Sequence, residues 1–190
     1  MEYKILGRTG LKVSIATLGC GGGSALGRSS NKSEEYSINI VKKALDLGVN
    51  FIDTARVYGT EKIVGKAIKN INRDKIFIST KHHVAMKEKK YSIKDIILGL
   101  DSSLKELETD YIDIFHLHGV TPKYFDYTMT LVPELLREKE KGKFRFLGIT
   151  ESSPLDAEQI TMSKALNANC FDVIMFAFSV MNHNAKKIIF

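Results

Sequence analysis

The segment Tyr111–His118 reads YIDIFHLH and carries the clearest structural pattern in the chain. Two earlier segments, Val49–Asp53 (VNFID) and Lys75–Lys81 (KIFISTK), have the same form. Short runs rich in β-branched and aromatic residues are typical of strands buried in a parallel sheet. Each run ends at polar residues, so the three segments predict neighbouring strands that present polar groups at their carboxyl ends.

Helical patterns separate these strands. Ser33, followed by two carboxylates, is a capping signal for a helix that ends at Gly48, and Ser92 caps a helix with a regular apolar stripe. The remaining expected elements are a hairpin (3–6 and 12–15), strands at 17–19, 144–149 and 171–176, and helices at 60–70, 133–141, 154–168 and 184–190.

Strands that alternate with helices predict an α/β fold with right-handed parallel crossovers. A doubly wound sheet and a TIM barrel both satisfy this pattern. Six strands suit an open sheet, whereas eight are needed to close the barrel. No linker, repeat or low-complexity tract interrupts the pattern, so a single domain over residues 1–190 is expected.

The composition is that of an ordinary folded protein, with 44% hydrophobic and 26% charged residues in a 190-residue chain. A net charge of +6 is too mild to indicate nucleic acid binding. Cys20 and Cys170 form no CxxC pair, which favours the cytoplasm, and the longest apolar run, 173–178, is too short to span a bilayer. Lysines at 87–90 are interpreted as part of a loop or helix end.

Two glycine-containing segments resemble nucleotide-binding loops without meeting their rules. The cluster Gly19–Gly23 follows the first strand but fails the G-x-G-x-x-G spacing, and the segment Gly59–Ala67 departs from the P-loop spacing and lacks its Ser or Thr. Nucleotide hydrolysis is therefore rejected. A flexible loop that lets backbone approach a ligand stays open for the first cluster.

Four polar residues are expected to meet at one rim. Asp53, Lys81 and His118 stand at the carboxyl ends of successive strands, and Tyr58 lies five residues beyond Asp53. Reactive groups collect at this end of parallel sheets and barrels. Each residue alone has a simple structural explanation, so it is their joint placement that indicates a functional site.

His116 and His118 suggest a second kind of site. Alternate residues of a strand share a face, so this H-x-H pair suits a metal. Together with Asp53, the pair would form the metal site of a metal-dependent barrel hydrolase, although Lys81 would repel a cation. His82 and His83 are interpreted as loop residues. A third alternative is a non-catalytic barrel that binds a nucleotide or a partner protein.

Six segments form an ordered set along the chain: LGRTGLKVS (6–14), GVNFIDTA (48–55), YGTE (58–61), STK (79–81), DYID (110–113) and GKFRFLGIT (142–150). With these segments, over residues 2 to about 184, the chain resembles the aldo-keto reductase family. The resemblance implies a (β/α)8 barrel, NADPH as the usual cofactor with NADH possible, a small carbonyl substrate, no metal, and a catalytic set of Asp53, Tyr58, Lys81 and His118.

The chemistry of these groups agrees with carbonyl reduction. Hydride addition creates an alkoxide, which a general acid must protonate, and Tyr58 is the expected donor. Lys81 is expected to lower the pKa of that phenol, Asp53 to keep Lys81 charged, and His118 to orient and polarise the carbonyl oxygen. Segment 119–130, with its aromatic residues, is a candidate wall of the substrate pocket.

The expected cofactor contacts depart from the family pattern. Thr150 and Glu151 stand where many members have Ser-Asn, and Met175 and Phe178 stand where a Gln and a Tyr are common. Phe178 keeps a stacking face, whereas Met175 has no amide. The full expected cofactor-binding set is Gly21, Gly22, Asp53, Thr150, Glu151, Met175 and Phe178.

Length is the larger departure from the resemblance. The pattern contains about six β/α units, so the chain is expected to be a C-terminally truncated member that lacks the last two. An incomplete barrel of this kind exposes strand edges, and weak or no NADPH binding and impaired activity are expected from the 190-residue chain. No feature of the sequence specifies an oligomeric state.

Overall fold

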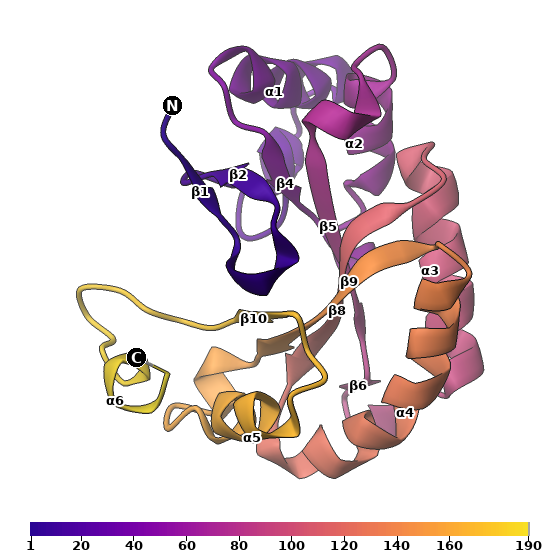
Figure 1. Cartoon of the computed structure of the whole chain (residues 1–190). Coiled ribbons are helices and arrows are strands. Elements are labelled where there is room, and N and C mark those ends of the chain that lie inside the picture. Colours follow the sequence, from indigo (N-terminus) through magenta and orange to yellow (C-terminus); the bar gives the residue numbers. More distant parts are fainter. Residues whose placement is uncertain (190) are drawn as a thin grey trace.

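A computed structural model describes residues 1–189 and contains a curled, six-stranded parallel sheet (Figure 1). Its strand order is β10-β9-β8-β5-β4-β3, and every neighbouring pair is parallel. The sheet corresponds to six strands of a TIM-type barrel, as predicted. The strands are β3 (Leu18–Gly19), β4 (Phe51–Asp53), β5 (Phe77–His83), β8 (Ile112–Val120), β9 (Phe144–Glu151) and β10 (Val173–Met175).

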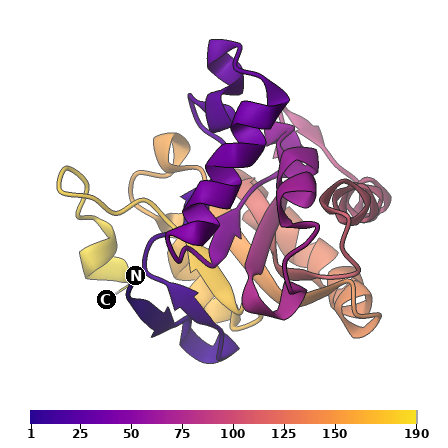
Figure 2. The ribbon, with the colours of Figure 1, turned by 90° about the horizontal axis from the view of Figure 1, so that it is seen from above.

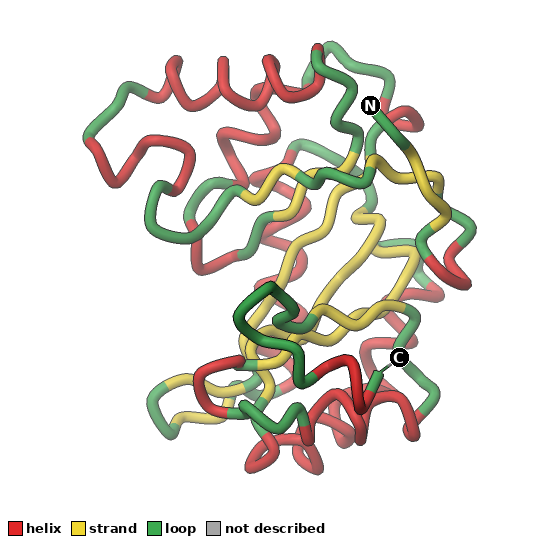
Figure 3. The backbone as a smooth tube through the Cα atoms, turned by 90° about the vertical axis from the view of Figure 1, so that its left-hand side faces the viewer, coloured by secondary structure: helices red, strands yellow, loops and turns green. Residues whose placement is uncertain are grey.

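Helices lie mainly on the outer side of the curved sheet (Figures 2 and 3). The side chain of Ser33 caps the first helix, and Ser92 and Asp95 form a reciprocal capping box at the third. Both caps were predicted. The helices are α1 (Glu34–Asp46), α2 (Glu61–Ile68), α3 (Ile93–Leu107), α4 (Pro122–Glu140), α5 (Ile160–Ala168) and α6 (Ala185–Ile188).

The predicted N-terminal hairpin is present as antiparallel β1 (Tyr3–Ile5) and β2 (Lys12–Ser14). Leu11 and Val13 pack against Phe51 and Ile114 of the sheet. Phe51 is the first residue of its strand, so the hairpin covers the amino-terminal end of the sheet. The opposite end, where the polar residues were expected, is left free of this cover.

A buried carboxylate fixes the strands near the amino-terminal end. Asp113 is fully buried and pairs with Arg73 at 2.7 Å and Arg145 at 2.8 Å, and it also accepts the backbone N–H of Ile78 at 2.9 Å. These contacts join β8 to β5, to β9 and to the short helix before β5. A buried charge that keeps all its partners fixes the register of the strands that supply them.

Two helix boundaries and one hairpin differ from the predictions. Helix α4 begins at Pro122, eleven residues before the predicted start, and Pro133 lies inside it on the exposed side. Helix α5 begins at Ile160 because Asp156 accepts the N–H groups of Ile160 and Thr161. The lysines at 87–90 belong to a hairpin, β6 (Ala85–Met86) and β7 (Lys89–Lys90). Among residues 1–189, no helix combines the length and apolar character of a membrane span.

Candidate active site

Asp53 and Lys81 form a buried ion pair at the carboxyl ends of β4 and β5. Lys81 is 1% exposed, and its Nζ lies 2.5 Å from Oδ2 of Asp53 and 2.8 Å from the carbonyl oxygen of Thr54. The hydroxyl of Ser79 donates to the other carboxylate oxygen. Burial lowers the pKa of Lys81, and Asp53 opposes that change. The pair is therefore rigidly held by hydrogen bonds on both sides.

Tyr58 lies beside this pair at the end of a short 3-10 helix, Arg56–Tyr58. Lys81 Nζ is 5.2 Å from the centroid of its ring. A Cβ atom at residue 21 would come within 2.5 Å of the same ring, so Gly21 makes room for Tyr58. The glycine at position 21 therefore allows the close packing of Tyr58. Gly22, with φ of +70°, allows the backbone turn that follows.

The predicted lowering of the Tyr58 pKa is wrong for this arrangement. Burial, and then the carboxylate of Asp53, raises the pKa of Tyr58. Lys81 is already neutralised by Asp53, and among the described residues no hydrogen bond joins the Tyr58 hydroxyl to Lys81. The phenol is therefore protonated throughout the neutral range.

His118 completes the cluster from β8. Its ring contacts that of Tyr58 edge to face, with centroids 5.7 Å apart, and its Nδ1 is buried without a hydrogen-bond partner. Burial, together with His83 and Lys81, lowers the pKa of His118 to about 3. A neutral imidazole keeps one N–H donor. The four residues predicted to share a rim thus lie together.

His116 does not build the alternative metal site. Its ring is fully buried against Gly148, where a Cβ would lie 2.2 Å from the imidazole Nδ1, and burial lowers the pKa of His116 well below the usual value. Within residues 1–189, no group of three or more His, Cys, Asp or Glu side chains could hold a metal ion. The hydrolase alternative therefore has no geometric support.

The adjoining β9 and β10 carry the residues expected at the cofactor. Thr150 and Met175 are paired in register, and the Thr150 hydroxyl accepts the N–H of Gly119 at 2.8 Å. One oxygen of Glu151 accepts the N–H of Ala177 at 2.7 Å, and the other is buried without a partner. Burial, and to a smaller extent Asp156, raises the pKa of Glu151. Phe178 lies beyond the end of β10 and is 51% exposed.

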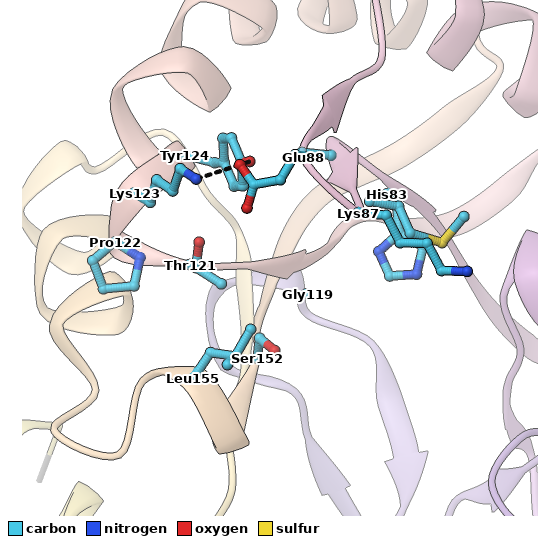
Figure 4. A pocket seen from close by; sticks show the side chains of 12 residues that line it. His83, Lys87, Glu88, Gly119, Thr121, Pro122, Lys123, Tyr124, Ser152 and Leu155 are labelled. Atoms are coloured by element: carbon cyan, nitrogen blue, oxygen red, sulfur yellow. Dashed lines mark hydrogen bonds and ion pairs between the residues drawn. The ribbon is translucent and has the colours of Figure 1, made fainter.

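A pocket of about 650 Å³ lies at the same rim, next to Gly119, the residue that follows His118 (Figure 4). His83, the hairpin β6–β7, the start of α4 and the segment after β9 line it. Of the predicted aromatic wall, Tyr124 reaches the pocket, whereas Phe125 is buried in the core and Tyr127 bonds to the carbonyl of Tyr91.

Ser79 and His83 are site residues that the sequence did not single out. Both lie in β5 on the same face as Lys81, as alternate residues do. His82 and His83 were predicted to be loop residues, but β5 continues through them because they pair with β8. The two-residue spacing of Ser79, Lys81 and His83 along the strand was the sequence signal that could have identified Ser79 and His83.

The fold defines an α/β protein of the TIM-barrel type, with a cluster of ionisable side chains at the carboxyl ends of its strands. The chain belongs to the aldo/keto reductase family, because the family model matches residues 17–190. The resemblance found in the sequence is thereby confirmed.

Relatives and solved structures agree with this assignment. L-galactose dehydrogenase of Arabidopsis thaliana is 35% identical over 163 residues, which cover 82% of this chain and 50% of that protein. Aldo-keto reductase YhdN of Bacillus subtilis is 35% identical over 164 residues, covering 80% and 48%. The chain therefore spans about half the length of the curated relatives it matches.

Two solved structures match nearly all of the fold. A thermostable aldo-keto reductase crystallised with the inhibitor epalrestat has a TM-score of 0.78 and 26% identity, and the match covers 99% of this chain and 66% of that one. The holo form of an aldo-keto reductase from Bacillus halodurans has a TM-score of 0.74 and 31% identity, covering 94% and 58%.

Proposed function

We propose that this chain is an oxidoreductase that reduces the carbonyl of a small aldehyde or ketone, with NADPH as the hydride donor and NADH as the second candidate. The observation that carries the proposal is the meeting of Tyr58, His118 and the Asp53–Lys81 pair at one rim. Family membership supports the same chemistry.

Tyr58 is the proposed general acid. Its raised pKa keeps the proton on the phenol at neutral pH, where it is available to the oxygen that gains charge. His118 is neutral and donates one hydrogen bond, so it orients the carbonyl without titrating near neutral pH. Asp53 holds Lys81 with its Nζ 5.2 Å from the centroid of the tyrosine ring, so the pair acts by holding the ring in position and not by lowering the pKa of the phenol.

The residues on β9 fit the nicotinamide end of the cofactor. A carboxamide needs a donor for its oxygen and an acceptor for its N–H₂ group. The Thr150 hydroxyl accepts one bond and can still donate, and the unpartnered oxygen of Glu151 can accept. Phe178 supplies an exposed aromatic face, and Met175 lies beside Thr150. The bound cofactor would supply the hydride, and these residues would orient it.

The test is an assay of NADPH and NADH consumption with a panel of aldehydes and ketones, with and without a metal chelator. We expect cofactor oxidation to match alcohol formation and the chelator to have no effect. Cofactor binding without turnover would favour the non-catalytic alternative instead. Activity abolished by the chelator and restored by zinc would contradict the proposal.

A further inference from the structure

His83 is the last residue of β5 and the register partner of His118. The two imidazoles are stacked, with centroids 4.1 Å apart and planes inclined by 13°. His83 Nδ1 lies 3.1 Å from the carbonyl oxygen of His118. One face of the His83 ring thus packs on a residue of the rim cluster, and the residue also lines the adjacent pocket.

The hydrogen bond to His118 assigns the tautomer of His83. A carbonyl oxygen can only accept, so Nδ1 must carry a proton. Burial lowers the pKa of His83, so the ring is neutral at neutral pH and carries no second proton. Nε2 is therefore an acceptor, and it makes no hydrogen bond to any residue in the described part of the chain.

The pocket beside His83 has a mixed character that suits a small polar molecule. Thr121 and Ser152 contribute hydroxyl groups, and Leu155 and Met86 contribute apolar surface. An ion pair between Glu88 and Lys123 joins the β6–β7 hairpin to α4 along one wall, and the Tyr124 hydroxyl donates to Glu88 at 3.2 Å (Figure 4). Thr121, Ser152 and His83 line the same pocket.

We propose that His83 Nε2 accepts a hydrogen bond from a hydroxyl group that the substrate carries next to its carbonyl, so that the site selects hydroxylated aldehydes and ketones. The inference rests on the proposed function, because the carbonyl is taken to lie at Tyr58 and His118. Because the two rings are stacked, with centroids 4.1 Å apart, a substrate whose carbonyl meets His118 has its neighbouring carbon next to His83. A substrate without the hydroxyl would leave the acceptor unpaired.

Hydroxyacetone and acetone are the matched substrates for a test, since they differ by one hydroxyl next to the carbonyl. The readout is the ratio of their kcat/KM values. We expect His83→Phe, which keeps an aromatic ring against His118, to lower the ratio about fivefold to tenfold. His83→Gln, whose amide oxygen can accept, should restore most of it. Equal losses with both substrates, or an unchanged ratio, would overturn the proposal.

A second measurement decides the role of His83 without turnover. Nitrogen NMR of the ¹⁵N-histidine-labelled protein, with and without NADP⁺, should identify an Nδ1–H tautomer for His83. Hydroxyacetone should shift its Nε2 resonance, and acetone should not. A proton on Nε2, or equal shifts, would refute hydroxyl recognition. A selective shift in a protein that reduces neither ketone would instead refute the proposed function and leave the role of His83 standing.

Discussion

The two sides of the rim are built differently. On the side of β4, β5 and β8, Lys81 is 1% exposed and Asp53 14% exposed, and their hydrogen bonds are made within the protein. On the side of β9 and β10, Glu151 keeps an unpartnered oxygen and Phe178 is half exposed. The charges proposed to assist proton transfer are therefore held in place before any ligand arrives, whereas Glu151, which is proposed to bind the cofactor, keeps a buried oxygen without a hydrogen-bond partner.

The largest expected effect comes from breaking the preformed side at Lys81. Lys81→Met leaves the Asp53 carboxylate and the Thr54 carbonyl without their buried partner. We expect the free energy of unfolding to fall by about 3 kcal/mol, near the lower end for such pairs because Asp53 keeps some contact with solvent. Urea unfolding followed by circular dichroism measures it.

Lys75, an exposed residue just before β5, provides the control. Lys75→Met removes a charge from the surface. Its effect should be within about 0.5 kcal/mol. Equal effects of the two substitutions would mean that the rim ion pair contributes no special stability.

The next effect concerns catalysis on the same side. Tyr58→Phe removes the proposed proton donor and keeps the ring that packs against Gly21 and His118. We expect kcat to fall roughly 100-fold, equivalent to about 2.7 kcal/mol of barrier, with little change in stability. Steady-state cofactor oxidation measures it, and Tyr36→Phe on the outer surface of α1 is the matched control. Retention of full activity would remove Tyr58 from the mechanism.

The preformed side should also make the protein sensitive to acid. Burial holds the pKa of His116 well below its value in the unfolded chain, so the unfolded state takes up the proton first as the pH falls below about 6.5. This one group should cost at most about 2 kcal/mol of stability between pH 7 and pH 5, the limit set by the ordinary pKa of histidine in the unfolded chain. His116→Leu removes two unpartnered nitrogens and should flatten the profile; an unchanged slope in urea titrations would contradict this.

The smallest effect is expected on the β9 side. Glu151→Gln can still accept the N–H of Ala177, but it replaces a free acceptor by a donor. We expect the Kd of the reduced cofactor to rise about fivefold and stability to stay within about 0.5 kcal/mol of the parent. Fluorescence titration measures the binding. A large loss of stability with unchanged binding would show that the two sides are built alike.

Strands and the rim cluster could be predicted because they depend on local patterns. Each of Asp53, Lys81 and His118 stands at the end of a short run rich in apolar residues, and parallel strands bring such ends together. The early start of α4 was missed because Pro133 reads as a helix start. Its missing N–H is tolerated because it faces solvent while Leu131 and Leu135 are buried on the other side.

Electrostatic consequences were harder to predict than positions. The sequence places Lys81 near Tyr58, but only the coordinates place the Asp53 carboxylate so that it cancels the lysine charge and raises the pKa of Tyr58. The role proposed for His83 likewise depends on the orientation of its ring and on a hydrogen bond to the backbone carbonyl of His118. The residue pattern and spacing in the sequence contain no information on the position of the Asp53 carboxylate or on the orientation of the His83 ring.

Because Gly21 has no side chain, the loop after β3 leaves space for the ring of Tyr58, which lies 37 residues later in the sequence. A methyl group at position 21 would come within 2.5 Å of the phenol ring and displace the ring from its contacts with Lys81 and His118. Small residues introduced at position 21 are thus a means of adjusting the position of the proposed proton donor, Tyr58, in engineered variants while its own side chain is kept.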